Sequence, residues 1–481
     1  MTADLHTEVL VVGSGAGGSI TATRLAEAGL DVTVIEEGPW ISPELYAPFS
    51  EAEMVTKYRH QGVNAMLGLP PIAYVEGRCV GGGTEINSGL YHRPPAAVLA
   101  DWRHRYAIED LDSDDLSRHA DLVEEELSVS RVPADVPMSS DVLDRGGRAL
   151  GWKVVEVPRL FRYPDGDSSW RAGVKQTMTR SFIPRAVEQG ARIFPDCRVQ
   201  RLVRQGDRVL GAECLRMTST DGRRESFTVH ADNVFVCAGT IQTPALLQRS
   251  GVRRNIGTSF KAHPTIKLGA RFASPLDDQG FIPMHQVKEF APDFTFGGSV
   301  SRPGYVALAM ADDWTANARD IEDSERVGVY YAAIRSDGCG RVRSVRGLTS
   351  PLVSYRLTDG DLSRLARSLI HLGELLFASG AERLYPSVTN APAVDSPRQL
   401  VKLWDAVTRT RSNLMTIHLF SSVGMGERRE VTGADSHGRV WGFSNLYVND
   451  ASLLPDAPGV NPQGTIMAIA SRNCERFLAT R

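Results

Sequence analysis

The chain has 481 residues, of which 42% are hydrophobic and 23% charged, and its formal net charge is −3. This balance is typical of a globular protein and argues against a disordered, fibrous or coiled-coil chain. A charge so close to zero provides no basic surface for a phosphate backbone, so we expect no nucleic-acid partner. The length predicts two compact units.

The start of the chain and its cysteines favour a cytoplasmic protein. The first strand-like run begins at Glu8 without a basic or apolar leader before it, so we expect no secretory signal. No apolar run approaches the roughly 20 residues that span a bilayer, so we expect no membrane span. The six cysteines are scattered and form no C-x-x-C pair, which predicts neither a disulfide framework nor a metal site.

The N-terminal segment reads as strand, glycine turn, helix and strand. An apolar, β-branched run at Glu8–Val12 precedes the turn at 13–18. Small and apolar residues at Ser19–Ala28 are compatible with a helix, which Gly29 ends, and Asp31–Ile35 forms the second strand. The order of these elements predicts a βαβ unit.

The turn of this unit fits the G-x-G-x-x-G pattern of dinucleotide sites, with Gly13, Gly15 and Gly18 at its constrained positions. These glycines permit a tight turn, close approach of a pyrophosphate and packing of helix on strand, and the helix that starts at Ala16 offers free N–H groups to the phosphates. Glu36 ends the second strand, where an acid can bind ribose hydroxyls. NAD and FAD share this fingerprint, and a glycine turn that merely packs is the alternative.

The middle of the chain mixes irregular segments with strands. Residues 41–75 are irregular and proline-containing, 77–89 are glycine-rich, and 111–128 read as an acidic, solvated helix. Strands are expected at Arg198–Val203, Val209–Arg216 and Asn233–Val236, followed by a turn into a helix over Ala238–Ser250.

From about residue 255 to 410, short alternating runs favour an antiparallel sheet. Its expected strands include Thr265–Phe272, Tyr305–Met310 and Val327–Ile334. Helices are expected at 359–379 and from about 462 to 478. Segments with glycine turns, strands and helices alternate along the chain with segments typical of an antiparallel sheet. We therefore predict an α/β protein with discontinuous domains. A Rossmann-like domain takes 1–100, 190–255 and 411–481, and an α+β substrate domain on an antiparallel sheet takes 101–189 and 256–410.

Four separated segments together resemble the glucose–methanol–choline (GMC) oxidoreductase family. They are the fingerprint closing in Val34–Gly38, the run Gly77–Asn87, the run Gly239–Val252 and the block from His418 to Asn461. Arg253 replaces the glycine that usually ends the third signature. The resemblance spans both ends of the chain. It implies FAD as the cofactor of the Rossmann-like domain.

The resemblance also implies further cofactor contacts. The glycines Gly81, Gly82 and Gly83 would let the backbone run close to a flat ring or the diphosphate. The other implied contacts are Asn87, Val199, Ala238, Gly239, Asp450, Pro462 and Gln463. Asn87 can equally hold its turn, and Val199 can equally be plain core. Ile86 stands where some members carry a histidine bonded to flavin, so we expect noncovalent FAD, although His92 is nearby.

The chemistry that the resemblance implies is oxidation of an alcohol to an aldehyde or ketone. His418 would accept the hydroxyl proton, since imidazole with its pKa near 6.5 can be neutral at neutral pH, while hydride passes to flavin N5. Asn461 would hold the substrate oxygen. An asparagine before Pro462 is also a good helix N-cap, and both roles can hold. The helix N-terminus behind it would favour the negative charge of reduced flavin.

The resemblance leaves several classes of small-molecule alcohol as candidate substrates. The resemblance extends to cholesterol oxidases and long-chain alcohol oxidases, and also to aminoglycoside 6′-oxidases such as paromamine oxidases. A sugar or aminoglycoside hydroxyl and a sterol or long-chain alcohol are therefore both candidates. An amino sugar would favour acids at the pocket mouth, for which the candidates are Asp277, Asp278, Asp312 and Asp313. The alternative is that these aspartates simply lie in solvent-exposed loops.

Three more residues have unsettled roles. Glu289 is a candidate substrate contact or an ordinary surface charge, His263 is interpreted as structural, and His285 lies in the expected substrate domain. The electron acceptor, O2 or another compound, and the oligomeric state are not determined by these patterns. A lyase that retains flavin and a non-catalytic flavoprotein are the alternative functional classes.

Overall fold

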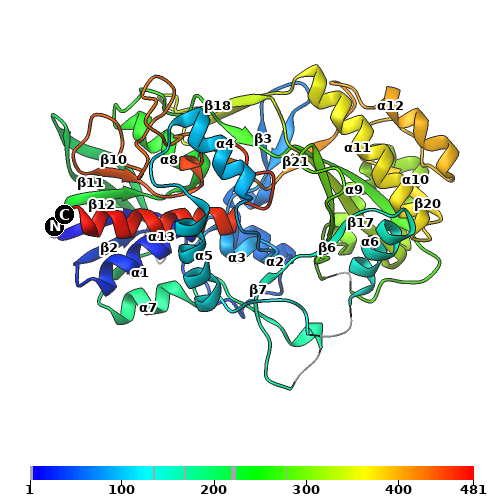
Figure 1. Cartoon of the computed structure of the whole chain (residues 1–481), viewed down its shortest axis with the longest axis horizontal. Coiled ribbons are helices and arrows are strands. Elements are labelled where there is room, and N and C mark those ends of the chain that lie inside the picture. Colours follow the sequence, from blue (N-terminus) through cyan, green and yellow to red (C-terminus); the bar gives the residue numbers. More distant parts are fainter. Residues whose placement is uncertain (1–3, 134–135, 167–168, 218–223, 279) are drawn as a thin grey trace.

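The computed structural model describes residues 4–133, 136–166, 169–217, 224–278 and 280–481. Two large β-sheets organise these residues, one in each half of the molecule (Figure 1). We refer to them as the first sheet and the second sheet.

The first sheet contains the expected βαβ unit. Its strands are β1 (Leu5–Val12), β2 (Val32–Ile35), β9 (Arg192–Phe194), β10 (Cys197–Gln205), β11 (Arg208–Met217), β12 (Arg224–Val236) and β23 (Leu446–Val448). Their order is β10-β11-β12-β1-β2-β9, with β23 also paired to β12. β1 is parallel to both β2 and β12, whereas β10 and β11 form an antiparallel extension. The strands predicted in this region are confirmed.

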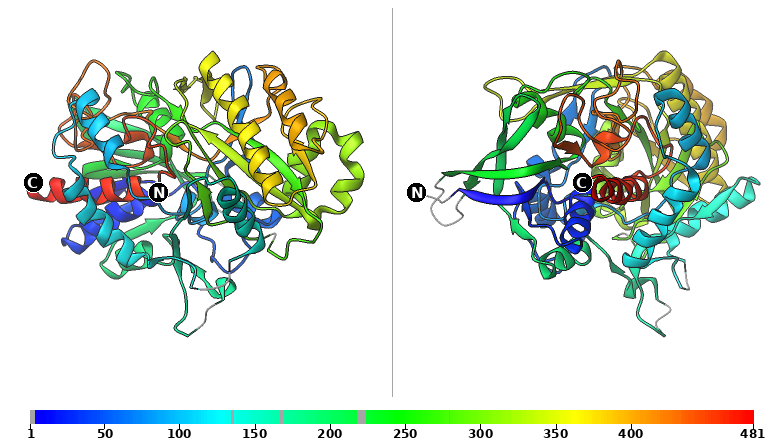
Figure 2. Two further views of the ribbon diagram at one scale, coloured as in Figure 1. Left: turned by 45° about the vertical axis from the view of Figure 1, so that its right-hand side comes forward. Right: turned by 60° about the vertical axis from the view of Figure 1, so that its left-hand side comes forward.

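Helices cover both faces of the first sheet. Val9 and Val11 of β1 pack into a buried cluster with α1 (Ala16–Glu27) and α13 (Gln463–Ala479). Figure 2 shows these two helices lying side by side. Leu10 and Val12 point to the opposite face and belong to a second cluster, which includes residues of α4 (Ala96–Tyr106) and α8 (Gly239–Arg249). Because a parallel sheet is buried on both faces, its strands read as continuous apolar runs.

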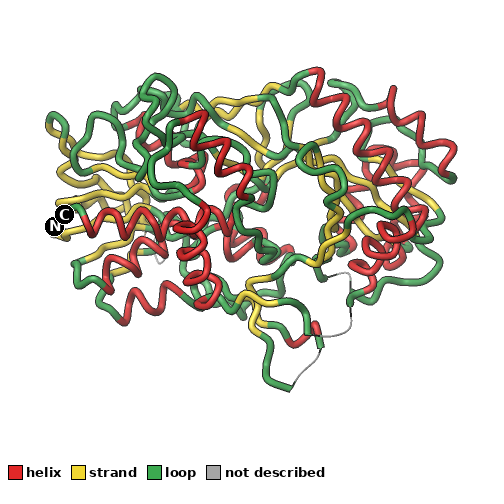
Figure 3. Tube along the Cα trace, in the orientation of Figure 1, coloured by secondary structure: helices red, strands yellow, loops and turns green. Residues whose placement is uncertain are grey.

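The second sheet is largely antiparallel. Its strands are β3 (Asn64–Met66), β4 (Ile72–Tyr74), β6 (Val154–Glu156), β14 (Thr265–Arg271), β15 (His285–Val287), β16 (Phe294–Gly298), β17 (Val327–Ile334), β20 (Arg383–Pro386) and β21 (Leu414–Thr416). Their order is β3-β4-β21-β14-β17-β16-β15-β6, with β20 on β14. The helices α11 (Asp359–Ala378) and α6 (Met138–Ala149) pack on its outer face. Figure 3 shows the strands lying between these helices and the first half of the molecule.

The two faces of the second sheet differ in burial. Ile266 and Leu268 of β14, and Ala332 and Ile334 of β17, are fully buried beneath the outer helices. Their neighbours in the strands, which point to the inner face, are only half-buried. They are Thr265, Lys267, Tyr331 and Ala333. Successive side chains of a strand alternate between faces, so the inner face carries a row of accessible and partly polar side chains.

One predicted strand is wrong. Tyr305–Met310 lies in the helix α9 (Pro303–Met310), which buries Val306, Ala309 and Met310. That spacing of three and four residues is the period of a helix. The run is apolar without alternation, its Ala, Leu and Met favour a helix, and Pro303 suits the first helical turn. The helices predicted at 111–128, 359–379 and 462–478 are confirmed as α5 (Ser113–Glu126), α11 and α13.

The two halves of the molecule interleave more than the predicted boundaries allow. The strands β3, β4 and β21 belong to the second sheet, although the prediction placed residues 1–100 and 411–481 with the first. Conversely, α5 and α7 (Phe182–Glu188), from the segment 101–189, pack against α13 and α1 of the first half. Among the described residues, no helix combines the length and apolarity needed to cross a bilayer.

Candidate active site

A cavity of about 310 Å³ lies at the carboxyl ends of the parallel strands. Val12, Glu36, Ala238 and Asp450 line it, and each stands at the end of, or just after, β1, β2, β12 or β23. In open α/β sheets this edge is where ligands bind. Further walls come from the glycine-rich segment around residues 82–90, from the block 417–419 with 461–463, and from residues 75–77 and 197–199.

The glycines of the fingerprint serve two purposes: Gly13 allows close packing of the backbone, and Gly15 leaves space for a ligand. Gly13 has φ +98°, and a Cβ added there would lie 2.5 Å from the carbonyl oxygen of Cys237. A Cβ added at Gly15 would meet nothing within 4 Å, and Gly15 lines the cavity. Gly15 is also the residue before α1, whose N-terminus no side chain caps. The turn therefore presents free backbone N–H groups to the cavity.

Ser14 joins the fingerprint to the second glycine segment. The Glu36 carboxylate accepts hydrogen bonds from Ser14 N (3.0 Å), Ser14 Oγ (2.8 Å) and Gly38 N (2.8 Å). Gly81 N in turn donates to Ser14 Oγ (3.1 Å). Burial raises the pKa of Glu36, and the donors from Ser14 and Gly38 act against that rise. Glu36 lines the cavity and also holds the turn together.

The second segment meets the C-terminal helix at Asn87. Gly82 and Gly83 line the cavity, whereas Gly81 lies behind them. Asn87 lines it too and holds its turn, because its Oδ1 accepts from Gly89 N (2.9 Å). Its amide donates to Gln463 Oε1, and its contact with the cofactor stays a prediction. The Gln463 Nε2 group is buried and has no hydrogen-bond partner among the residues that the structure describes.

One end of the cavity is formed by an apolar side chain and a group of charged side chains. Val199 lines one end and is 5% exposed. Sequence reasoning missed the ion-paired group beside it, in which Arg59 contacts Glu37 (2.9 Å) and Glu76 (3.7 Å). Burial is the largest influence on Glu76 and raises its pKa. Glu37 lies in the Val34–Gly38 segment, but Arg59 and Glu76 belong to no motif, so no sequence signal marked this ion-paired group.

Asp450 sits under the turn that begins α8. Its carboxylate accepts from Gly239 N (2.8 Å) and Ser452 N (2.8 Å), and from the hydroxyls of Thr243 (2.5 Å) and Ser452 (2.5 Å). Burial raises the pKa of Asp450 despite these donors. The partners expected for a buried acid are present. Ala238 and Gly239 border the cavity here, and a Cβ at Gly239 would meet nothing within 4 Å.

His418 is held at the other end of the cavity by a short strand pair. It precedes β22 (Leu419–Phe420), which pairs with β13 (Lys261–Ala262) in the register Ala262 to Leu419. That register brings His263 beside His418, and His263 N donates to the His418 carbonyl (3.3 Å). His418 N donates to Thr416 Oγ1 (3.1 Å), which fixes the backbone on its other side.

A series of side-chain hydrogen bonds determines which ring nitrogen of His418 carries the proton. Asn461 Nδ2 donates to His418 Nε2 (3.3 Å), and Gln286 Nε2 donates to Asn461 Oδ1 (3.2 Å). His92 Nε2 donates to Gln286 Oε1 (3.1 Å). The Nδ1 atoms of His418 and His263 lie 3.2 Å apart, so one must donate to the other. Because His418 Nε2 acts as an acceptor, its proton is assigned to Nδ1. Nε2 then carries the lone pair of a base.

Burial keeps His418 neutral. Desolvation, followed by the positive charge of Lys288, lowers the pKa of His418 to about 4. The same two causes, in the same order, lower the pKa of His92 to about 3. A neutral imidazole with an unprotonated Nε2 is the form required of a general base at neutral pH.

The other predicted residues have different outcomes. The N-cap alternative for Asn461 is wrong, since α13 begins at Gln463 without a side-chain cap and the Asn461 amide is engaged elsewhere. Pro462 lines the cavity directly before that helix. Glu289 does not reach the site, because it is exposed and accepts from Lys153 N (2.9 Å).

The acids considered for an amino sugar lie away from the cavity and make contacts of their own. Asp277 pairs with Arg171, Asp278 accepts from Ser139, and Asp312 accepts from Thr389 and Asn413. His285 bonds Ser140 of α6, on the outer face of the second sheet. Among the described residues, no group of three or more His, Cys, Asp or Glu is arranged to hold a metal ion.

Comparison with known proteins identifies the family. Two models described as GMC oxidoreductase match residues 8–265 and 335–470. The chain belongs to the GMC oxidoreductase family. It is therefore an FAD-dependent enzyme of the kind that acts on CH–OH groups, which confirms the resemblance and the cofactor expected from it.

Similar proteins cover nearly the whole of this GMC oxidoreductase. The GMC-type oxidoreductase y4nJ of Sinorhizobium fredii is 40% identical over 99% of this chain and 95% of its own length. Long-chain-alcohol oxidase FAO1 of Arabidopsis thaliana is 25% identical over 98% of this chain and 66% of its own. The structure of pyridoxine 4-oxidase from Mesorbium loti has a TM-score of 0.76 at 18% identity, covering 98% of this chain and 99% of that one, so it shares the fold.

The residues around the cavity fit FAD. A dinucleotide needs backbone that a ligand can approach, and Gly15, Gly83 and Gly239 all border the cavity with open space where a Cβ would stand. The uncapped N-termini of α1 and α13 both open on it, and the dipole of each favours an anionic group. The unpartnered Gln463 Nε2 offers a donor at the α13 end.

Proposed function

We propose that this enzyme oxidises a small-molecule alcohol to an aldehyde or ketone, with His418 as the base and Asn461 as the anchor of the substrate oxygen. The observation that carries the proposal is the contact of 3.3 Å between Asn461 Nδ2 and His418 Nε2 in the wall of the cavity. An alcohol oxygen placed between them can accept from the amide and donate its proton to the imidazole.

Each residue then has a defined task. His418 Nε2 takes the hydroxyl proton, and the Asn461 amide stabilises the oxygen as negative charge develops on it. Gln286 holds that amide through Asn461 Oδ1 (3.2 Å), and His263 holds the imidazole through Nδ1 (3.2 Å). Bound FAD supplies the acceptor for the hydride that leaves the substrate carbon. As the C–H bond breaks, the oxygen keeps its electron pair and forms the carbonyl.

We propose that FAD is held without a covalent bond. Ile86 lines the cavity and has no nucleophilic atom. His92 is not among the residues that line it, and its Nε2 atom is occupied by Gln286. Denaturing the purified protein with acid should release all of the flavin into the supernatant, and flavin that stays with the precipitated chain would contradict this.

The proposal includes an electron acceptor and a cellular compartment. We take O2 or another small oxidant as the acceptor. None of the six cysteines forms a disulfide, which is compatible with a protein of the reducing cytoplasm.

Reduction of the bound flavin by an alcohol tests the reaction. Under anaerobic conditions, flavin absorbance near 450 nm should bleach when a panel of primary and secondary alcohols is added to the holoenzyme. Readmitting air then reports whether O2 reoxidises it. A lyase that retains flavin, or a protein that only binds it, gives no bleaching with any alcohol while it still contains FAD.

A further inference from the structure

The inner face of the second sheet forms a roof over His418. Lys267 of β14 is paired with Tyr331 of β17, so both side chains point to this face. Arg335 follows β17 in the same alternation as Tyr331, two positions beyond Ala333. Lys288 follows β15 two positions after Gln286, which reaches the Asn461 amide. The inner face therefore carries three cationic side chains, and two of them, Lys288 and Arg335, lie with His418 around one recess.

A recess of about 20 Å³ opens beneath this roof, on the far side of His418 and Asn461 from the main cavity. Both of those residues line the two cavities, so the recess adjoins the point where the substrate oxygen would sit. Lys288, Tyr331 and Arg335 line it as well. Among the described residues, no aspartate or glutamate does. Its volume holds one or two groups the size of a water molecule.

Lys288 enters this recess without a counter-ion. The described residues give its ammonium no hydrogen bond or ion pair, and burial alone lowers the pKa of Lys288 to about 8. It is nevertheless mostly charged at neutral pH, and its charge depresses the pKa of His418. A buried cation without a partner is costly, so proteins keep such groups paired or place them where a ligand supplies the partner.

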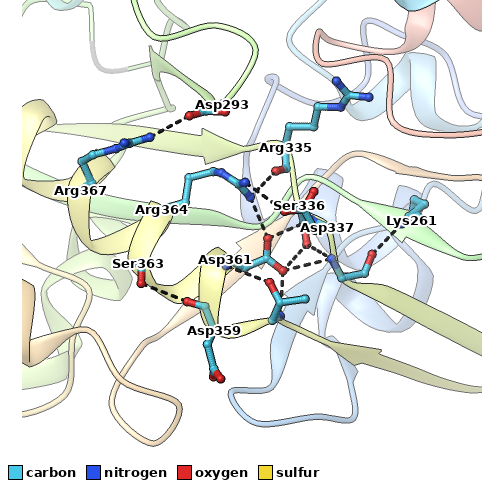
Figure 4. Close-up of polar contacts among 12 residues, drawn as sticks. Lys261, Asp293, Arg335, Ser336, Asp337, Asp359, Asp361, Ser363, Arg364 and Arg367 are labelled. Carbon is cyan, nitrogen blue, oxygen red and sulfur yellow. Dashed lines mark hydrogen bonds and ion pairs between the residues drawn. The ribbon is translucent and has the colours of Figure 1, made fainter. Parts of the chain in front are cut away.

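Arg335 is held in place from outside the recess. The Asp361 carboxylate is fully buried and accepts from Asp337 N (2.9 Å) and Arg364 Nη1 (3.0 Å), while Arg364 Nη1 also donates to the Arg335 carbonyl (2.9 Å). Figure 4 shows the Arg335 side chain pointing away from this cluster. Its guanidinium forms an ion pair with Asp101 at 3.9 Å, which is longer than a hydrogen bond, so donors of the guanidinium remain for a ligand.

We infer that the substrate is an alcohol bearing a carboxylate, and that Lys288, with Arg335 and Tyr331, binds the carboxylate in this recess while His418 and Asn461 hold the hydroxyl. This rests on the function proposed above. A polycationic amino sugar would place ammonium groups against like charge. The rings of a sterol or the chain of a fatty alcohol would not fit into a space of about 20 Å³. A carboxylate matches the recess in both charge and size.

Matched pairs of acids and esters test this on the holoenzyme. The probes are glycolate, 4-hydroxybutyrate and 4-(hydroxymethyl)benzoate, each beside its methyl ester. For the acid of best length, kcat/KM should exceed that of its ester by at least about tenfold. Lys288→Met should reduce this acid-to-ester ratio by at least about tenfold, and Lys288→Arg should retain most of it. Flavin content and circular dichroism show whether each variant is folded.

Lys153→Met is the matched control. Lys153 is exposed, and its carbonyl accepts from Lys288 N (2.8 Å), so it lies beside Lys288 in the sheet but outside the recess. Its substitution should leave the acid-to-ester ratio unchanged. Equal preference for acids and esters in the native enzyme would overturn the inference. So would an equal loss for both in Lys288→Met, which would make Lys288 a group that acts on the chemistry rather than on recognition.

A binding measurement separates this inference from the proposed reaction. Benzoate lacks a hydroxyl, and its binding to oxidised holoenzyme can be followed by the flavin spectrum. The Kd for benzoate should rise at least about tenfold in Lys288→Met and stay unchanged in Lys153→Met. If benzoate behaves so but no alcohol bleaches the flavin, the anion site stands and the oxidation fails. If neutral alcohols bleach it and carboxylates gain nothing, the oxidation stands and the anion site fails.

Discussion

Replacing His418 by glutamine tests the proposed base most directly. The side-chain amide introduced by His418→Gln can still hydrogen-bond its neighbours but cannot accept a proton. General base catalysis contributes roughly 10²–10⁴-fold, so the alcohol should reduce the bound flavin more slowly by that factor, or about 3–5 kcal/mol in activation free energy. FAD content should stay the same, because His418 occupies only one end of the cavity.

The pH dependence follows from the environment of His418. Its pKa of about 4 means that roughly one imidazole in a thousand is protonated at pH 7. The base is therefore fully available at neutral pH. In the native enzyme, kcat/KM should fall only as the pH drops through about 4, provided that the fold survives. The His418→Gln variant should lack this acid limb.

Anaerobic stopped-flow absorbance at 450 nm measures both effects. His285→Gln is the matched control, because His285 is a buried histidine that bonds Ser140 (2.9 Å) on the outer face of the second sheet. Its rate should stay close to that of the native enzyme. A rate for His418→Gln within threefold of the native rate, at unchanged flavin content, would refute the assignment of His418 as the base.

Three further predictions concern the surroundings of this base. Asn461→Ala should lower kcat/KM for flavin reduction by roughly 10–100-fold without loss of FAD, because it removes one donor to the substrate oxygen and the acceptor that Gln286 Nε2 contacts; steady-state kinetics check this. Gly15→Ala should fold with little change in the unfolding midpoint but lose most of its FAD, seen in the absorbance ratio of flavin to protein, because its Cβ would project into open cavity. Lys288→Met should move the acid limb of kcat/KM for a neutral alcohol to higher pH by roughly one unit, since removing a neighbouring positive charge raises the pKa of His418.

The sequence predicted best those features for which nearby residues require a particular residue type at a given position. The fingerprint predicted a βαβ unit, and the structure gives Gly13 the positive φ and Gly15 the open space that its two positions require. Glu36 follows β2 and lines the cavity. These features depend on contacts within one turn or one strand pair, so short-range patterns capture them.

Sequence reasoning was weakest where orientation decides function. In the segment around β15, it singled out His285 and Glu289. The structure turns those side chains to the outer face or to solvent, and brings Gln286 and Lys288 to the recess beside His418. A shift of one residue moves every side chain to the other face of a strand, and no local signal shows which face meets the active site. The helix at Tyr305–Met310 was missed for a similar reason, since a short apolar run fits either structure.

By itself, the sequence determined the Rossmann-like unit, the family resemblance and the pairing of His418 with Asn461 as candidates. It could do so because glycine turns and family signatures are local. Only the tertiary structure decided that Asn461 contacts His418 rather than capping α13, and that Lys288 reaches the recess without a counter-ion. These facts depend on side chains from strands far apart in the chain, which meet only when the second sheet packs over the first.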